Sequence, residues 1–172
     1  MSLLGKLFGP KPKRLCLEDI RVIKGKVRPV KESEVTEAEV ALGCSFPAGY
    51  QEYITKFGEG VLGGTFVRVY PPARIVRELP QFRQRWNEYW FWEKGHATSS
   101  KEQVLESIII ADTMNGDELI FHPNRPDRLL VLPRGGDLIY EAGSNLFDTI
   151  EWLCSSGVLT KPFKARNFEP DE

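Results

Sequence analysis

The stretch LGCSFPAGYQEYITKFGEG, residues 42–60, is rich in aromatic residues and glycines and has few side chains suited to catalysis. Four of its large side chains follow at spacings of three, one and three residues: Tyr50, Tyr53, Ile54 and Phe57. This spacing places them on one face of a helix. We therefore expect the stretch to build the core of a domain, with function located on surfaces around it.

Residues beside this apolar face predict where helices begin and end. Thr36 and Glu39 have the spacing of a capping box, which predicts a helix that starts at Thr36. Gly43 suits the left-handed residue that commonly ends a helix. Pro47 suits the first position of the next helix, and Gly60 lies where the chain should leave that helix for a sheet.

The remaining pattern predicts strands in the second half of the chain. Asn115-Gly116 is a strong hairpin signal between two apolar runs, and Asn145 suits the cap of a final amphipathic helix. Pro80 should divide or kink a helical segment at 73–94, and residues 95–103 resemble an exposed loop. Strands are expected at 65–70, 108–112, 118–121, 128–132 and 138–141.

These elements predict an α+β fold with a single domain. One mainly antiparallel sheet of about five or six strands should be wrapped by N-terminal, middle and C-terminal helices. We expect a basic flexible leader at 1–14, the domain at 15–157 and a polar C-terminal tail at 158–172.

Composition excludes several classes of protein. The chain has 172 residues, 27% charged residues and a net charge of -1, so no overall charge favours nucleic acid. It contains no apolar run of the ~20 residues that a membrane span needs, and its start is a poor signal peptide. Cys16, Cys44 and Cys154 are scattered, which favours free thiols in the cytoplasm over a zinc site.

The order of these motifs resembles the SMI1/KNR4 family, also called the SUKH superfamily. The resemblance covers roughly residues 32–155, and the central hairpin at 110–121 and the last helix with Trp152 also match. The family's opening pattern maps onto Leu42, Gly43, Phe46, Pro47, Tyr50, Tyr53, Phe57 and Gly60.

The resemblance implies a single α+β domain and a role in binding. Bacterial relatives are largely immunity proteins that bind and neutralise a cognate toxin domain, whereas fungal relatives resemble regulators and scaffolds of cell-wall synthesis. Neither role requires catalysis or a cofactor. Because similarity of fold alone does not establish function, the residues must be weighed as well.

Catalytic and metal-binding patterns are weak. His122 follows a predicted strand and His96 lies in the predicted loop, outside any recognisable nucleophile motif. A deep pocket that holds His122 beside a carboxylate would favour an enzyme. The acids near Gly116 lack the spacing of a calcium loop, so we expect no metal and no cofactor.

The segment 82–92 is the most aromatic part of the chain. Phe82, Trp86, Tyr89 and Trp90 share a helical face that suits a core, while Phe91 and Trp92 should point elsewhere. Such off-face rings favour a protein-binding patch, and nucleic acid is a weaker alternative.

The sequence thus favours a non-catalytic protein-binding module, an immunity protein that neutralises a polymorphic or contact-dependent toxin by occlusion. The alternative is a regulatory scaffold that binds an endogenous protein or a glycan. We expect acidic side chains to attract a basic groove of the partner, with aromatic anchors beside them. The candidate contact residues are Glu59, Tyr70, Trp90, Trp92, Asp112, Asp117, Glu118 and Asp137.

Overall fold

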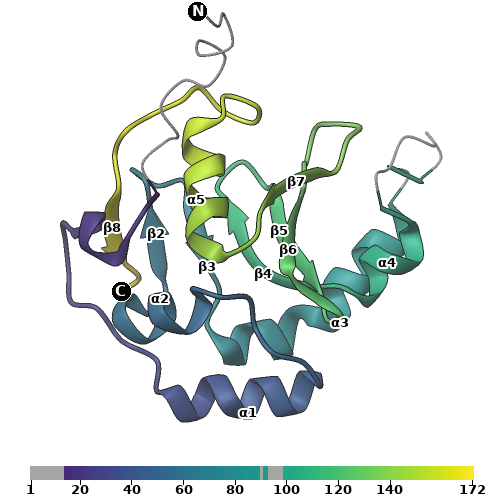
Figure 1. The fold of residues 1–172 in the computed structure, drawn as a ribbon, viewed down its shortest axis with the longest axis horizontal. Coiled ribbons are helices and arrows are strands. Elements are labelled where there is room, and N and C mark those ends of the chain that lie inside the picture. Colours follow the sequence, from purple (N-terminus) through teal and green to yellow (C-terminus); the bar gives the residue numbers. More distant parts are fainter. Residues whose placement is uncertain (1–13, 90, 93–98) are drawn as a thin grey trace, which may run out of the picture.

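A computed structural model describes residues 14–89, 91–92 and 99–172 of the chain. In this part of the chain, eight strands form one open sheet in the order β1-β8-β2-β3-β4-β5-β6-β7 (Figure 1). Only the pair β1 and β8 is parallel among the paired strands. The strands are β1 (Arg21–Val22), β2 (Gly60–Leu62), β3 (Val67–Val69), β4 (Ile108–Thr113), β5 (Glu118–His122), β6 (Arg125–Leu132), β7 (Tyr140–Gly143) and β8 (Asn167–Pro170).

The α+β class and the mainly antiparallel sheet are confirmed, but the predicted number of strands is too low. Strands β2 and β8 contain three and four residues, too few to show an alternating pattern, and β1 contains only two. Strand β8 lies between β1 and β2, and its Phe168 is fully buried. The segment 158–172, which we expected to be a polar tail, therefore supplies part of the sheet and of the core.

Five α-helices of the described residues surround the sheet (Figure 1). Helix α5 lies in front of the sheet in this view, α1 runs below it, and α3 leads toward α4 at the lower right. Helix α3 contacts both α1 and β4, and α5 contacts β7. The helices are α1 (Glu32–Leu42), α2 (Tyr50–Phe57), α3 (Pro72–Glu88), α4 (Lys101–Glu106) and α5 (Leu146–Ser155).

The stretch at 42–60 builds the core as its pattern predicts. Tyr50, Tyr53, Ile54 and Phe57 are all buried on α2. Phe46 is also buried, with its ring centroid 4.2 Å from that of Tyr50. This apolar face therefore holds the helix against the sheet, chiefly because its burial removes apolar surface from contact with water.

Gly43, Gly49 and Gly58 of this stretch have positive φ angles. Gly43 has φ +69° and ends α1 in the left-handed conformation, as predicted. Gly58 has φ +70°, and a Cβ atom there would lie 2.0 Å from the backbone oxygen of Arg28. Gly58 is therefore required for two reasons. Its φ angle is positive, and the backbone of the loop before α1, which carries Arg28, approaches it too closely for a side chain.

The predicted helix starts are displaced. Helix α1 begins at Glu32, because Glu34 accepts a hydrogen bond from the Lys31 amide at 3.0 Å and caps the helix one turn earlier. Glu39 instead accepts from the amide of Phe46 at 2.8 Å. Helix α2 begins at Tyr50 rather than Pro47, because Gly49 between them has φ +88°, which is not a helical angle.

Helix α3 runs without a break through Pro80, contrary to the predicted division. Pro80 is exposed, so the backbone bond it cannot make lies on the solvent side of the helix. The predicted loop at 95–103 is also wrong at its end, because α4 begins at Lys101. Residues 95–98 of that loop lie outside the described part. The Asn115-Gly116 hairpin and the Asn145 cap are confirmed, with Gly116 at φ +92° and Asn145 accepting from the Asp148 amide at 3.0 Å.

Candidate functional site

Two adjoining hollows lie along helix α3, and we call them together the α3 groove. They share Arg85 of α3 and Glu118 of β5. The first has a volume of about 370 Å³ and is also lined by Trp86, Tyr89, Gly116, Pro133 and Arg134. The second, of about 240 Å³, is also lined by Tyr70, Glu78, Gln81, Phe82, Ile109 and Asp112.

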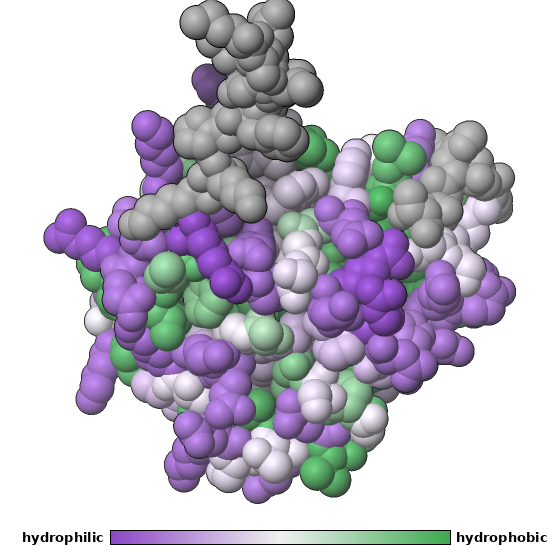
Figure 2. Space-filling view, in the orientation of Figure 1, coloured by the Kyte–Doolittle hydropathy of each residue, from purple (hydrophilic) through white to green (hydrophobic). Residues whose placement is uncertain are grey.

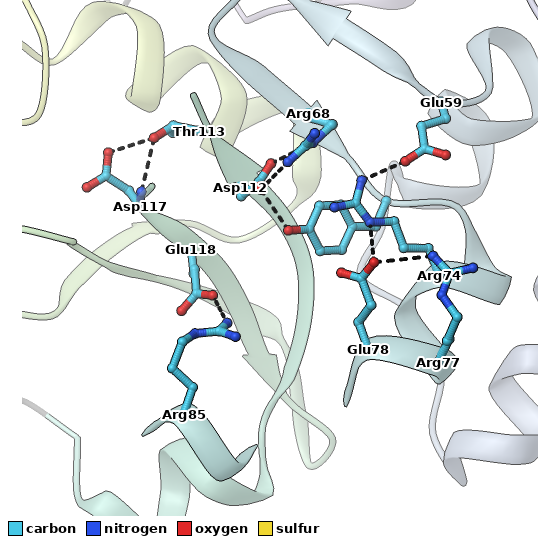
Figure 3. Close-up of polar contacts among 11 residues, drawn as sticks. Glu59, Arg68, Arg74, Arg77, Glu78, Arg85, Asp112, Thr113, Asp117 and Glu118 are labelled. Atoms are coloured by element: carbon cyan, nitrogen blue, oxygen red, sulfur yellow. Dashed lines mark hydrogen bonds and ion pairs between the residues drawn. The ribbon is translucent and has the colours of Figure 1, made fainter. Parts of the chain in front are cut away.

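Glu118 lies where the two hollows meet. Its carboxylate accepts a hydrogen bond from the guanidinium of Arg85 on α3 (Figure 3). It also accepts one from the indole N–H of Trp86 on the same helix. Its side chain is only 12% exposed. Burial raises the pKa of Glu118 above its ordinary value, and the contacts with Trp86 and Arg85 oppose this shift.

A second polar cluster crosses strands β3 and β4. Arg68 and Asp112 are partners in the strand register, and Arg68 donates two hydrogen bonds to the Asp112 carboxylate, at 3.0 and 2.6 Å. The Tyr70 hydroxyl donates to the same carboxylate at 2.8 Å. The hydrogen bonds that Arg68 donates to Asp112 raise the pKa of Arg68, and burial raises the pKa of Tyr70. Asp112 is thus held by groups of its own chain.

Arg74 connects helix α3 to the loop before β2. It donates to Glu59 at 2.6 Å and to Glu78 at 2.9 Å, as Figure 3 shows. Its guanidinium lies over the ring of Tyr70, 3.8 Å from the ring centroid. The pair of Arg74 and Glu78 has i, i+4 helical spacing, so this one contact could have been read from the sequence.

The candidate acids are therefore already in contact with cationic or donor groups. Arginines of the chain pair with Glu59, Asp112 and Glu118. Asp117 is buried and accepts from the Thr113 hydroxyl at 2.7 Å and from the Arg134 amide at 3.0 Å. Asp137 is exposed in the loop between β6 and β7. The groove consequently presents mixed charges. The sequence did not reveal these pairs, because strand register and the packing of α3 bring the arginines to the acids.

The aromatic candidates have different environments. Tyr70 is buried, and Trp92 is half-buried with its indole N–H donating to the Trp86 carbonyl at 2.7 Å. Phe91, expected to point away from the core, is buried against Trp86. Trp90 lies outside the described residues. The role of these rings in binding stays a prediction.

His122 lies in a separate pocket of about 250 Å³ together with Gln103, Ser107 and Arg128. Its Nε2 atom is 3.0 Å from a carboxylate oxygen of Glu106, so the histidine and carboxylate that would favour an enzyme are adjacent. However, its Nδ1 atom accepts from the Asn124 amide at 3.1 Å, which leaves Nε2 as the protonated nitrogen that donates to Glu106. Both ring nitrogens are engaged, whereas a general base needs a nitrogen open to the substrate.

The described residues offer neither a metal cluster nor a membrane-spanning helix. Within residues 14–89, 91–92 and 99–172, no group of three or more His, Cys, Asp or Glu side chains is placed to hold a metal ion. No helix in the described part of the chain has the length and apolar character needed to cross a bilayer.

Comparison with known proteins gives a family for this fold. No curated protein matches the chain. The model of the SMI1 / KNR4 family (SUKH-1) matches residues 29–152, which include α1, α2, α3, the strands from β2 to β7 and most of α5. Because this match spans well over half of the sequence, the chain belongs to the SMI1/KNR4 family (SUKH-1).

Proposed function

We propose that this chain is a non-catalytic protein-binding domain of the immunity type. It would act in the cytoplasm, where it neutralises a cognate polymorphic or contact-dependent toxin by covering the toxin's active site or substrate groove. Membership of the SMI1/KNR4 family supports this function. The observation that carries the proposal is the α3 groove, a preformed surface whose charged side chains are already held in place by ion pairs within the chain.

The groove has the composition of a protein-binding surface. Trp86, Tyr89 and Arg85 line it, and these three residue types are enriched among the residues that dominate binding energy at interfaces. Arg85 is 53% exposed at the rim, while its partner Glu118 lies deeper. Because the ion pairs fix these side chains, binding would order few groups and lose little conformational entropy.

The polar groups also favour binding over catalysis. The carboxylates of Asp112 and Glu118 accept hydrogen bonds from arginine, tyrosine and tryptophan, so their oxygens are engaged within the chain. His122 uses both of its ring nitrogens within the chain. These contacts support a surface that recognises another macromolecule.

The test uses the protein encoded beside this chain's gene, if that protein ends in a toxin domain. We expect the purified toxin domain to bind this chain with a one-to-one stoichiometry in calorimetry and to lose activity on binding. Arg85→Ala should weaken the affinity by about tenfold or more, because it removes an exposed interface arginine. Arg125→Ala is the control, since Arg125 is exposed and lines the His122 pocket instead.

The same titration tests the aromatic candidates. Loss of affinity in Trp90→Ala or Trp92→Ala would support a role for that tryptophan in contacting the toxin. Unchanged affinity in both variants would exclude both tryptophans as contact residues. If the toxin domain remains fully active and unbound at micromolar wild-type protein, the immunity function is wrong. A melting temperature raised by an oligosaccharide would then favour the scaffold alternative.

A further inference from the structure

We infer that the surface around Arg134 binds an extended segment of the partner protein in which an acidic residue lies between two apolar residues. This inference rests on the proposed function, because it names the chemistry of the partner's contacting segment. It differs from the sequence-based expectation of a basic partner groove. The reason is that the acids of the α3 groove are already paired, whereas Arg134 is not.

The backbone of Arg134 is fixed from both sides. Its amide donates to the buried Asp117 at 3.0 Å, and its carbonyl accepts from the Tyr89 hydroxyl at 3.2 Å. Its side chain packs over Gly116, where an added Cβ atom would lie 2.7 Å from the Arg134 Cδ atom. These contacts direct an exposed arginine out of the turn that follows β6.

The guanidinium of Arg134 differs from those of the neighbouring arginines in its ion pairing. It makes no ion pair with any carboxylate of the described residues, in contrast to Arg68, Arg74 and Arg85. A guanidinium binds a carboxylate with two parallel hydrogen bonds when the geometry allows. Arg134 is therefore positioned to accept an acidic side chain from outside the chain.

Hollows with apolar walls lie on either side of Arg134. The first hollow of the α3 groove offers Trp86, Tyr89 and Pro133. A further hollow of about 570 Å³ also includes Pro133 and Arg134 and is lined by Tyr140, Val158 and Leu159. Val158 is 47% exposed, so apolar surface of this hollow is accessible to a partner.

The arrangement along this surface is thus apolar, cationic, apolar. In an extended segment, alternate side chains point to the same face, roughly 7 Å apart. A segment with the pattern apolar-x-acidic-x-apolar would place its carboxylate on Arg134 and one apolar side chain in each hollow. Hydrophilic and hydrophobic residues are interspersed on the face that carries α5 (Figure 2), so apolar side chains alone would give that face little selectivity.

The first experiment measures the affinity of the toxin domain for matched variants. We expect Arg134→Glu to weaken binding by about 30-fold or more and Arg134→Ala by about tenfold, since the former adds repulsion between like charges. Arg83→Glu is the control, because Arg83 is an exposed arginine of α3 that lines none of these hollows. Equal melting temperatures would show that Arg134→Glu folds normally. Wild-type affinity in Arg134→Glu would overturn the inference and leave the proposed function standing.

The second experiment needs no toxin. The ¹⁵N-labelled protein is titrated with the capped peptide Ser-Leu-Ser-Glu-Ser-Leu-Ser at millimolar concentrations. Matched peptides carry Gln in place of Glu, or Ser in place of both Leu residues. We expect shifts at the Gly116 amide, the Trp86 indole and the Leu159 amide that weaken with either altered peptide. Identical shifts with the Glu and Gln peptides, or shifts confined to other surfaces, would overturn the inference.

The two experiments separate the two proposals. A peptide effect at these positions without any binding of the toxin domain would remove the immunity function and retain the peptide-binding surface. Toxin binding that is unchanged by substitution of Arg134, together with no chemical-shift change on addition of the peptides, would retain the immunity function and remove the peptide-binding surface.

Discussion

Arg68 and Asp112 face each other across strands β3 and β4, and their side chains form a two-pronged ion pair with N–O distances of 3.0 and 2.6 Å. The carboxylate is 14% exposed and also accepts from Tyr70. Arg74 in turn lies over the Tyr70 ring. One aspartate therefore connects two strands and the start of helix α3, so its charge should matter for stability as well as for the shape of the groove.

Replacing Asp112 with Asn tests this connection. The amide keeps the size of the side chain and one acceptor, but it leaves the half-buried Arg68 without a counter-charge. We expect the free energy of unfolding to fall by about 1.5–3 kcal/mol, the range for a hydrogen bond to a charged group. Urea denaturation followed by circular dichroism measures it. Asp127→Asn, at the exposed pair with Arg125, should leave the midpoint unchanged.

Two glycine substitutions separate backbone strain from steric overlap. Gly43→Ala should cost about 1–2 kcal/mol, the penalty of the left-handed conformation, because nothing lies within 4 Å of the added Cβ atom. Gly58→Ala adds an overlap with the Arg28 carbonyl, so we expect a loss of more than about 4 kcal/mol or failure to fold. Equal melting temperatures for the two variants would contradict this account.

The C-terminal strand provides a third prediction. Phe168 is fully buried, with ring centroids 5.1 Å from Phe57 and 6.2 Å from Tyr53. Phe168→Ala should destabilise the protein by about 3–5 kcal/mol, as expected for a large cavity in a core. Lys164→Ala, at an exposed position in the same segment, is the control in the same denaturant titration. A minor effect of Phe168→Ala would mean that β8 contributes little to the folded state.

The raised pKa of Glu118 predicts a dependence on pH. Because the folded protein holds this proton to a higher pH than the unfolded chain does, Glu118 favours folding below its ordinary pKa. That contribution is lost as the pH rises through the folded pKa. Glu118→Gln has no such titration, so its stability relative to wild type should increase from pH 4 to pH 7. Urea midpoints at closely spaced pH values measure the difference, and a constant difference would refute the shift.

Much of the fold could be predicted from residues close together in sequence. The apolar face of α2, the turn at Gly43, the Asn115-Gly116 hairpin and the Asn145 cap depend on spacings of a few residues, and all four are present. The capping box of Ser100 and Gln103 was equally readable and would have revealed α4. Local backbone geometry and hydrophobic periodicity suffice at this range.

The candidate site could be predicted only in part. Glu59, Asp112 and Glu118 were identified as acids, but the arginines that pair with them lie 15, 44 and 33 residues away. Which charges meet depends on strand register and on how α3 packs against β4. The sequence shows which residues are charged, but it does not show which arginine forms an ion pair with which acid.

The sequence by itself determined the α+β class, the core face at 50–57, the main hairpin and the resemblance to a family of binding domains. Only the tertiary structure placed residues 167–170 between β1 and β2, joined Arg68 to Asp112, and left Arg134 exposed and without an ion pair to the carboxylates of the described residues. The physical reason is range. Turns, caps and helical faces are set by neighbouring residues, whereas strand order and charge pairing follow from the burial of the whole core.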